Sequence, residues 1–445
     1  MATIEIPRKA VPVLADADVV VCGGGPAGIA AALAARRAGR SVLLLEQTGM
    51  LGGMGTAGLV PSILVMDDGE RVLADGICRE VVDEMARRMG VAPDYHWQDV
   101  NPEILRRLYD ELVTEAGITL YLGLSVVDAL VEGGRIAAVV VSTKQGVKAV
   151  RGRVYVDATG DGNLCAWAGA AFDMGDELGR TMSPTLCVQY AGVHWARYRE
   201  LQPWPHGYVC RRWQELVGAG LIPVEERHLC GVWPHGPGTG SGNLGHIYGV
   251  NGLDERDITR GYLEGRRLAP LIHQFYREHV PGFAASELVS TASLLSIRET
   301  RRIRGDYQLS FADYQRRANF ADEIGRYAGA VDIHSSSTDP KEQEATERRI
   351  GETKLTKGES YGIPYRVLVP SGLENVLVAG RCVSCDRAVQ ASLRIQAACF
   401  ITGQAAGCAA ALSADRDGAV RQIEVTALQR LLRQQGAYLR DGLGD

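Results

Sequence analysis

Near its start the chain alternates apolar runs with stretches rich in small residues. The apolar residues 19–22 are followed by a glycine-rich run at 23–28 and by an alanine-rich stretch at 29–38. A second apolar run, 42–45, ends in Glu46. Short apolar runs bounded by glycine are typical of buried strands, and a longer run of small apolar residues is typical of a packed helix. The pattern therefore predicts a strand, a glycine turn, a helix and a second strand.

The glycine turn of this unit has the spacing that a dinucleotide needs. Glycine lets the backbone approach a pyrophosphate, and the next helix directs its N-terminal amides at the phosphates. An acid about twenty residues further on is placed to bind a ribose hydroxyl. The alternative is a tight turn that needs glycine only for its backbone angles. We expect a bound dinucleotide, with contacts at Gly23, Gly25, Pro26, Ala27, Gly28, Glu46 and Gln47.

The pattern after this unit is typical of the same kind of domain. Helical spacing at 79–89 and 102–116 is followed by short strand patterns between residues 118 and 143. A further apolar strand pattern at 154–156 leads into a second glycine turn at 157–162. Open parallel sheets bind ligands at the carboxyl ends of their strands, so this second turn is expected to lie near the first.

The middle of the chain has a different character from its two ends. Residues 181–361 contain clusters of Trp, His, Pro and Gly, whereas the tail returns to an apolar strand pattern at 376–378 and a long small-residue helix at 392–412. We therefore predict an α/β fold. A discontinuous Rossmann-like domain, formed by 1–180 and 362–445, is interrupted by an α+β substrate domain at 181–361.

Composition narrows the classes of partner. A chain of 445 residues and 48.0 kDa is larger than one hydrophobic core usually supports. A net charge of −5 provides no basic field for nucleic acid or a membrane, so neither partner is expected.

The first residues lack the pattern of a secretory signal, which predicts a cytoplasmic protein with its ten cysteines as thiols. Uncharged residues at 395–414 are diluted by Gln and Gly and predict a core helix. Metal-ligand spacing is lacking, and no metal is expected.

One dinucleotide site has to supply the redox chemistry. A second unit of strand, glycine turn and helix is not evident downstream, which argues against a separate NAD(P)H domain. FAD fits this arrangement better than NAD, because a flavin stays bound and can be reoxidised by another acceptor. The expected cofactor is FAD.

Further motifs accompany the N-terminal glycine segment. They are Leu-Gly-Gly-Met at 51–54, Asp-Ala-Thr-Gly-Asp-Gly at 157–162, Arg-Arg-Ile-Arg-Gly-Asp-Tyr at 301–307, Asp-Ile-His at 332–334, Gly-Ile-Pro-Tyr-Arg at 362–366, Ala-Gly-Arg-Cys at 379–382 and Thr-Gly-Gln-Ala-Ala-Gly at 402–407. In this order they resemble the bacterial FAD-dependent oxidoreductases of the glutathione-reductase-like superfamily, over most of the chain. The resemblance implies an FAD domain of the p-hydroxybenzoate-hydroxylase or succinate-dehydrogenase type with an inserted substrate domain.

The resemblance also implies a place for the cofactor contacts. Glu46 would hold the adenosine ribose, residues 23–28 the pyrophosphate, the backbone near Val126 the adenine, and Asp386 the pyrophosphate or ribityl chain. Residues 52–55 would lie near the flavin ring. The remaining contacts that it implies are Gly52, Gly53, Met54, Gly55, Ala158, Thr159, Gly160, Asp161, Gly380, Arg381, Ser392, Arg394 and Gln396.

The helix predicted to begin near Ser392 would aim its N-terminus at the N1–O2 edge of the flavin. A helix N-terminus stabilises the negative charge of a reduced flavin there. This chain departs from the family's pattern at one point, because many members carry Met-Pro shortly after the arginine equivalent to Arg394, whereas here Ile395, Gln396 and Ala397 follow. Gln396 is a candidate to hydrogen-bond the ring or the substrate, which would alter specificity.

Oxidation by a flavin usually needs a base for the departing proton. His334 is the leading candidate, because imidazole titrates near neutral pH; the alternative is a structural histidine bonded to a carbonyl. Arg301 and Arg304 are candidates to clamp an anionic substrate, and simple pairing with acidic residues is the alternative. Tyr361 and Tyr365 flank a Gly-Ile-Pro turn and are candidates to face the pocket, although buried tyrosines usually pack.

Three functions remain open at this point. The first is an FAD-dependent dehydrogenase or oxidase that transfers a hydride from a small organic substrate to flavin N5. The second is a flavin monooxygenase or hydroxylase that uses NAD(P)H and oxygen, and the third is a noncatalytic flavin subunit that relays electrons to a partner. Cys382 and Cys385 do not lie where the redox disulfide of glutathione reductases lies, so a catalytic disulfide is not expected. The substrate, the electron acceptor and the oligomeric state are not predicted.

Overall fold

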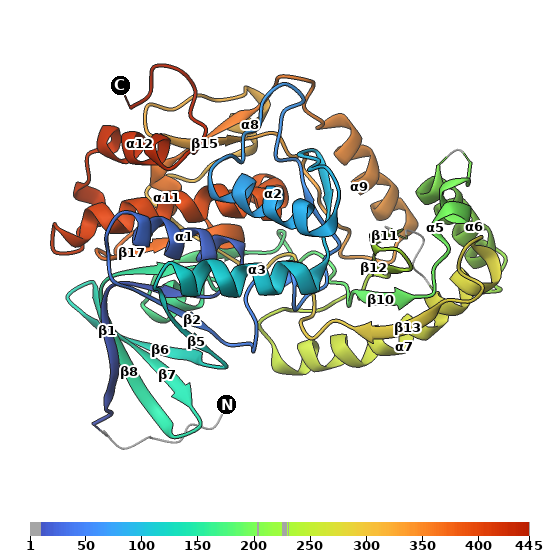
Figure 1. Ribbon diagram of the computed structural model, residues 1–445, viewed down its shortest axis with the longest axis horizontal. Helices are drawn as coiled ribbons and strands as arrows, with labels where there is room; N and C mark the ends of the chain where they lie inside the picture. The colour runs from blue at the N-terminus through green and yellow to red at the C-terminus, as the bar shows by residue number, and fades with distance from the viewer. Residues whose placement is uncertain (1–9, 203, 225–228, 230, 445) are drawn as a thin grey trace.

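A seven-stranded sheet forms the base of the larger domain (Figure 1). The computed structural model describes residues 10–202, 204–224, 229 and 231–444. The sheet has the order β5-β2-β1-β8-β7-β6, and β17 pairs with β8. Its strands are β1 (Val13–Cys22), β2 (Val42–Glu46), β5 (Thr119–Leu122), β6 (Ser125–Glu132), β7 (Arg135–Thr143), β8 (Gly146–Asp157) and β17 (Val376–Val378). Strands β5, β2, β1, β8 and β17 are parallel, whereas β6 and β7 form an antiparallel hairpin, so the predicted α/β class is confirmed.

Two parallel helices cover the centre of this sheet. They are α1 (Pro26–Arg37) and α11 (Gln396–Ala414). Their axes approach closely, because a β-carbon built on Gly403 or Gly407 would lie 2.2 Å from the carbonyl oxygen of Ala27 or Ala31. The N-termini of both helices therefore lie at the same end, beside the carboxyl end of β1. The layer is extended by α2 (Ile77–Met89), α3 (Pro102–Glu115) and α12 (Val425–Gln434).

Helix α11 is the one helix within the described ranges that is long and apolar enough to cross a membrane. In the structure 94% of its apolar window is buried. It is a core helix, as its composition predicts.

The second domain is a cap with its own core, on the right in Figure 1. A four-stranded antiparallel sheet has the order β11-β12-β10-β13, and three helices pack around it. The elements are β10 (Val188–Ala191), α5 (Trp195–Arg199), α6 (Pro205–Gly218), β11 (Gly231–Gly236), β12 (Thr239–Asn243), α7 (Glu255–His279) and β13 (Glu287–Thr291). Aromatic rings such as those of Tyr190, Tyr276 and Phe283 fill the space between sheet and helices.

Short elements connect the two domains and cover the larger one. They are β3 (Ser62–Leu64), β4 (Trp97–Asp99), α4 (Asn163–Trp167), β9 (Phe172–Met174), β14 (Arg301–Ile303), α8 (Phe311–Gln315), β15 (Glu323–Tyr327), α9 (Pro340–Glu352), β16 (Tyr361–Pro364) and α10 (Arg387–Leu393), with 3-10 turns at Gly53–Gly55, Tyr365–Leu368, Gly380–Cys382 and Val420–Gln422.

The chain returns from the cap earlier than the predicted boundary at residue 361. The cap core ends at Leu295, and β14 already pairs with β9 of the larger domain. Residues 309–331 pack in the same core as α1 and α11. The sequence did not show this, because loop-rich segments on both sides of the boundary have the same composition.

The long helix predicted at 392–412 is two helices. Helix α10 ends at Leu393, and Ile395 has an extended backbone with φ −67° and ψ 144°. The helix N-terminus is therefore at Gln396 and not near Ser392.

Candidate functional site

The first glycine turn connects β1 to α1, and at Gly23 and Gly28 it has no room for a side chain. Gly23 has φ +105°, and a β-carbon there would lie 2.3 Å from the carbonyl oxygen of Ala158. A β-carbon on Gly28 would lie 1.8 Å from the carbonyl oxygen of Gly23. Gly25 differs, because a β-carbon there would meet nothing within 4 Å. Since Gly25 is the N-cap of α1 and no side chain caps this helix, its open side leaves backbone N–H groups available to an anion.

Glu46 lies at the end of β2 against this turn. Its carboxylate accepts hydrogen bonds from the backbone N–H groups of Gly24 and Thr48, each at 2.7 Å, and only 6% of the residue is exposed. The backbone N–H of Leu124 donates to the carbonyl of Glu46, which brings the start of β6, and so Val126, beside the acid. Gln47 is exposed. The predicted ribose and adenine contacts are thus neighbours.

The loop at residues 52–58 lies between the N-termini of α1 and α11. A β-carbon on Gly53 would lie 3.2 Å from Cα of Gly25, and one on Gly55 would lie 2.6 Å from Oε1 of Gln396. Gly52 and Gly53 both adopt positive φ. Met54 holds the loop through its carbonyl, which accepts from the N–H of Val60.

Gln396 is oriented by one hydrogen bond. Its Nε2 donates to the carbonyl of Ser62 at 3.0 Å, whereas its Oε1 is buried and has no hydrogen-bond partner among the described residues. Among the described residues, no side chain caps the N-terminus of α11. A buried acceptor without a donor, beside the first turn of an uncapped helix, is typical of a ligand contact.

The second glycine turn lies next to the first and is held by Asp157 and Arg381. The carboxylate of Asp157 accepts from the hydroxyl of Thr159, and burial raises the pKa of Asp157. Arg381 donates from Nε to the carbonyl of Gly160 at 2.6 Å and forms an ion pair with Asp161. These residues therefore build the turn, and their predicted contact with the cofactor stays a prediction, as it does for Ala158.

Three other predicted contacts have structural partners. Both carboxylate oxygens of Asp386 accept backbone N–H groups, from Val389 and Phe311, so this side chain caps α10. Ser392 lies inside α10, where its hydroxyl donates to the carbonyl of Gly329. Gly380 has φ +82°, and its N–H donates to the hydroxyl of Thr402 in α11. Asp386 and Ser392 are therefore not left open to a ligand in the way that Gln396 is.

His334 lies at the junction of the cap and the larger domain. Its Nδ1 is 2.7 Å from Nε2 of His246, which follows β12 of the cap. Its Nε2 is 3.3 Å from Oδ2 of Asp332, and this oxygen accepts from Arg394 at 2.8 Å. Arg394 also donates to the carbonyl of Asp332 and stands two residues before Gln396. The four side chains form a chain of contacts that ends at the start of α11.

The charges of this chain follow from burial and from its neighbours. Burial, together with the charge of Arg298, lowers the pKa of His334 well below its ordinary value, so its imidazole is neutral at neutral pH. Burial alone would raise the pKa of Asp332, but the hydrogen bond from His334 and the charges of Arg394 and Arg298 outweigh it and hold that pKa well below the usual range. A neutral imidazole beside a carboxylate is able to accept a proton.

The two arginines predicted to clamp a substrate have separate protein partners. Arg301 donates to the carbonyl of Asp161 and to the side chain of Asn163. Arg304 pairs with Asp173, and 60% of its side chain is exposed. Arg301 belongs to β14 and Arg304 follows it, and the two guanidiniums have different protein partners.

The predicted tyrosines pack in the core. The hydroxyl of Tyr365 donates to the carbonyl of Val420 at 2.8 Å, and that of Tyr361 lies 2.7 Å from the hydroxyl of Ser392. Burial raises the pKa of both. Cys382 and Cys385 are free, buried thiols.

Residues that the sequence reasoning missed include His246 and Arg298. His246 has no motif around it and meets His334 only through the fold. Arg298 stands three residues before the Arg-Arg-Ile-Arg motif at 301–304, and it donates to the hydroxyl of Thr185 at 3.1 Å, close to the point where the chain enters the cap. Asp332 belongs to the Asp-Ile-His motif and could have been found from it.

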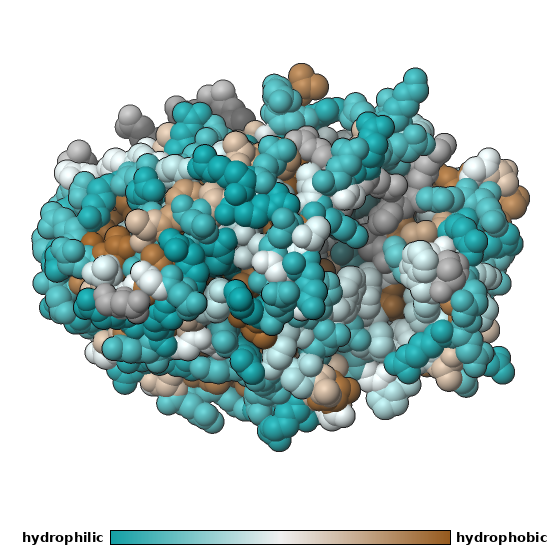
Figure 2. All heavy atoms as spheres, turned by 90° about the horizontal axis from the view of Figure 1, so that it is seen from above, coloured by the Kyte–Doolittle hydropathy of each residue, from teal (hydrophilic) through white to brown (hydrophobic). Residues whose placement is uncertain are grey.

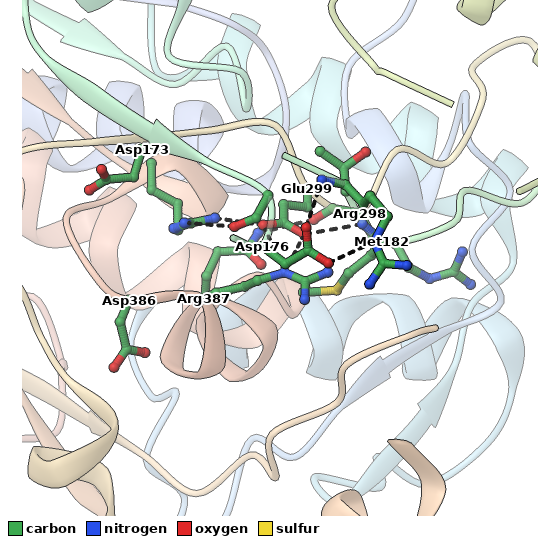
Figure 3. A network of polar contacts seen from close by, with 12 residues as sticks. Asp173, Asp176, Met182, Arg298, Glu299, Asp386 and Arg387 are labelled. Atoms are coloured by element: carbon green, nitrogen blue, oxygen red, sulfur yellow. Dashed lines mark hydrogen bonds and ion pairs between the residues drawn. The ribbon is translucent and has the colours of Figure 1, made fainter. Parts of the chain in front are cut away.

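A buried carboxylate holds together the two chain segments that run between the domains (Figure 3). Glu299 is completely buried and accepts from the backbone N–H of Met182 at 3.1 Å. It also pairs with Arg302 at 2.6 Å and with Arg387 at 3.0 Å. Both chain segments that cross between domains are thereby held to α10. Seen from above, the surface is hollowed between the larger domain and the cap (Figure 2).

The residues present fit FAD. The open side of Gly25, the buried acid Glu46 and the unpartnered Oε1 of Gln396 lie around one loop, between two helix N-termini that no side chain caps. A model of the family described as FAD dependent oxidoreductase matches residues 18–432. The chain belongs to this family. Its cofactor is accordingly FAD, and it is an enzyme.

Curated relatives match parts of the chain. Digeranylgeranylglycerophospholipid reductase 1 of Methanopyrus kandleri is 30% identical over 167 residues, which is 32% of this chain and 39% of that protein. Urocanate reductase of Eggerthella lenta is 41% identical over 97 residues, 20% of this chain and 15% of that protein. The chain thus matches less than half of the length of each.

Solved structures resemble the whole fold more distantly. A geranylgeranyl bacteriochlorophyll reductase-like protein from Thermoplasma acidophilum has a TM-score of 0.46 at 13% identity, covering 95% of this chain and 84% of its own. The flavin-dependent brominase Bmp2 has a TM-score of 0.47 at 15% identity, covering 94% and 83%.

Proposed function

We propose that this family member is a dehydrogenase or oxidase that removes a hydride from a small organic substrate. The observation that carries the proposal is the chain of contacts from His246 through His334 and Asp332 to Arg394, which ends beside Gln396 at the start of α11. Hydride removal leaves a proton on the substrate that a base has to take up, and the histidines of this chain of contacts are able to take it.

FAD supplies the acceptor for the hydride when it is bound. In this chain the turn at 23–28 and Glu46 would hold its dinucleotide part, and the loop at 52–55 with Gln396 would hold the flavin. The uncapped N-terminus of α11 favours negative charge nearby. The acceptor Oε1 of Gln396 would receive a donor from the ring or from the substrate.

The cap completes the site. His246 comes from the cap, and His334 comes from the larger domain, so the proton-handling pair exists only when the two domains are in contact. Only 9% of His246 and 13% of the His334 side chain are exposed, and burial keeps His334 neutral. The positions of these residues support a base for the departing proton at the domain junction.

The names of the curated relatives bear on the direction of hydride transfer. Both are reductases, and hydride transfer between a substrate and a flavin is reversible in principle, so the same histidines would donate the proton in reverse. We place the enzyme in the cytoplasm, where cysteines stay reduced, which fits buried free thiols such as those of Cys22, Cys78 and Cys408. A small-molecule substrate is the partner that we propose.

The test is anaerobic mixing of the purified FAD-loaded enzyme with a panel of small alcohols, amines and carboxylic acids. Bleaching of the flavin absorbance by a panel member supports the proposal. Consumption of NAD(P)H with oxygen and a panel member, without anaerobic bleaching, would instead show a monooxygenase. Inertness to every member in both assays would favour an electron-relay subunit and overturn the proposal.

A further inference from the structure

The side-chain amide of Gln396 has an orientation that its partner fixes. Nε2 donates to the carbonyl oxygen of Ser62 at 3.0 Å. Because a carbonyl oxygen only accepts, the end of the amide that meets Ser62 is the nitrogen, and Oε1 is the other end. Oε1 is buried and has no hydrogen-bond partner in the described part of the chain. It therefore lacks a donor.

This oxygen faces the glycine loop of the cofactor site. A β-carbon on Gly55 would lie 2.6 Å from Oε1 of Gln396, and only 7% of Gln396 is exposed. In the same loop, a β-carbon on Gly53 would lie 3.2 Å from Cα of Gly25, the N-cap of α1. Ser62 and Gly55 both belong to the larger domain, and the cap provides neither contact. We therefore expect the missing donor from the cofactor and not from a substrate held by the cap.

Gln396 also begins α11, whose end offers donors beside this acceptor. The first hydrogen bond within the helix runs from the N–H of Cys399 to the carbonyl of Ile395, and no side chain among the described residues caps the helix. The N–H groups of residues 396–398 therefore point out of the helix end without a partner inside it. One acceptor thus lies within a side chain's length of several donors.

An isoalloxazine ring has one edge that fits this set of groups. Oxidised flavin has a single ring N–H group, at N3, and this group stands between the carbonyl oxygens O2 and O4. A carbonyl oxygen next to an N–H group requires a donor next to an acceptor, which the first turn of α11 and Oε1 of Gln396 provide. The same placement puts O2 at the helix end, which favours the negative charge that reduction brings there.

We infer that Oε1 of Gln396 accepts the hydrogen bond of flavin N3–H, and that this bond sets how the ring lies against the loop at 52–55. The inference rests on the cofactor of the family and not on the reaction proposed above. It assigns to the ring the donor that the proposed function leaves open between ring and substrate. The bond also requires glycine at residue 55, because a β-carbon there would displace the oxygen.

The first experiment compares FAD with 3-methyl-FAD, in which a methyl group replaces the N3 proton. The flavin-free protein is titrated with each compound, and the ratio of the two dissociation constants is measured. A buried acceptor left without its donor weakens binding by at least about tenfold, so the wild type should bind 3-methyl-FAD that much more weakly than FAD. Gln396→Ala removes the acceptor and leaves room for the methyl group, so its ratio should be about one.

Two further variants make the comparison specific. Gly55→Ala places a methyl group against Oε1 and should lower the ratio toward that of Gln396→Ala, although Gln396 is still present. Gln404→Ala is the matched control, because this buried amide lies further along the same helix, where it accepts from the N–H of Ile77 and donates to the carbonyl of Gln435. It should keep the ratio of the wild type.

The second experiment reads the flavin nitrogen directly. Nitrogen NMR of the protein loaded with nitrogen-labelled FAD gives the resonance of N3, which moves downfield when N3–H donates a hydrogen bond. We expect this resonance to move upfield in Gln396→Ala and in Gly55→Ala, and to stay in place in Gln404→Ala.

The outcomes decide between ring and substrate. A wild-type ratio near that of Gln396→Ala would overturn the inference, whether both are high or both are near one. An N3 resonance that does not move in Gln396→Ala would also overturn it and would leave the substrate as the donor to Oε1. Neither experiment contains a substrate, so these results leave the proposed function untouched. An enzyme that no panel member reduces would overturn the proposed function alone.

Discussion

Glu299 and Arg387 form an ion pair of 3.0 Å between the segment that returns from the cap and the first turn of α10. The same carboxylate pairs with Arg302, and no surface of Glu299 is exposed. One negative charge thus serves two guanidiniums at the place where the two domains join (Figure 3).

Replacing Glu299 by Gln should destabilise the protein strongly. The side chain of Arg302, which is 6% exposed, would lose its carboxylate partner, and breaking a buried pair costs about 3–5 kcal/mol. Urea unfolding of the FAD-loaded protein measures the change. Glu103→Gln is the control, because that carboxylate is 63% exposed in its pair with Arg106 and should contribute less than about 1 kcal/mol. Equal midpoints for the two variants would contradict the prediction.

Gly403 should be intolerant of a side chain. A β-carbon at this position would lie 2.2 Å from the carbonyl oxygen of Ala27, so Gly403→Ala would force α11 away from α1 and separate the two helix N-termini at the cofactor site. We expect loss of bound flavin, measured as the ratio of flavin to protein absorbance. Gly218→Ala, at the end of α6 in open space, should keep its flavin and gain about 0.4–1 kcal/mol of stability. Full flavin content in Gly403→Ala would show that the helices can separate without harm to the site.

Much of the cofactor domain could be predicted from the sequence because its signals are local. Apolar runs, glycine spacing and the acid Glu46 define strand, turn, helix and strand within thirty residues, and the structure has them in that order. The break at Ile395 could not be predicted in this way. Small residues continue on both sides of it, and only the extended backbone of that one residue ends α10 and begins α11.

The contact between His246 and His334 shows what local sequence patterns cannot predict. His334 stands in a motif and was found, but its partner His246 is 88 residues away and has no local signal. Their contact depends on where the cap places the loop after β12. Residue type alone also does not reveal that Arg304 pairs with Asp173 or that the hydroxyl of Tyr365 donates to the carbonyl of Val420, and the predicted roles of both residues toward a substrate stay predictions.

Glu46→Gln should weaken FAD binding. In the protein both carboxylate oxygens accept backbone N–H groups, from Gly24 and Thr48, and an amide would turn an NH₂ group toward one of these donors. In the predicted ribose role the amide would also replace a charged acceptor of a ribose hydroxyl, and loss of a hydrogen bond to a charged group costs about 1.5–3 kcal/mol, which corresponds to at least about tenfold in affinity. Titration of the flavin-free protein with FAD, followed by flavin fluorescence, gives the dissociation constant. Glu132→Gln, exposed at the end of β6, should bind as the wild type does. Unchanged affinity of Glu46→Gln would remove the ribose role.

His334→Ala should slow flavin reduction by at least about tenfold and leave FAD bound. The alanine leaves Nε2 of His246 and Oδ2 of Asp332 without the ring between them, whereas the turn at 23–28 is untouched. Stopped-flow absorbance with the substrate from the panel measures the rate, and the flavin absorbance of the purified variant reports retention. A variant that keeps the wild-type rate would show that His334 is a structural histidine.

Asp99→Asn should stabilise the protein above about pH 6 and not at pH 4. Burial raises the pKa of Asp99 to about 6, against the hydrogen bond from Trp97 and the charge of Arg199, and its Oδ1 has no hydrogen-bond partner among the described residues. The folded state therefore binds more protons than the unfolded state between about pH 4 and pH 6, and wild-type stability falls as the pH rises through that window. The amide has the same size and no charge, so it removes a cost of about 3 kcal/mol at neutral pH. Urea unfolding at pH 4 and pH 8 tests this, with Asp128→Asn on the exposed part of β6 as the control. A gain for Asp99→Asn that is equal at both pH values would mean that the carboxylate is not held in its protonated form by burial.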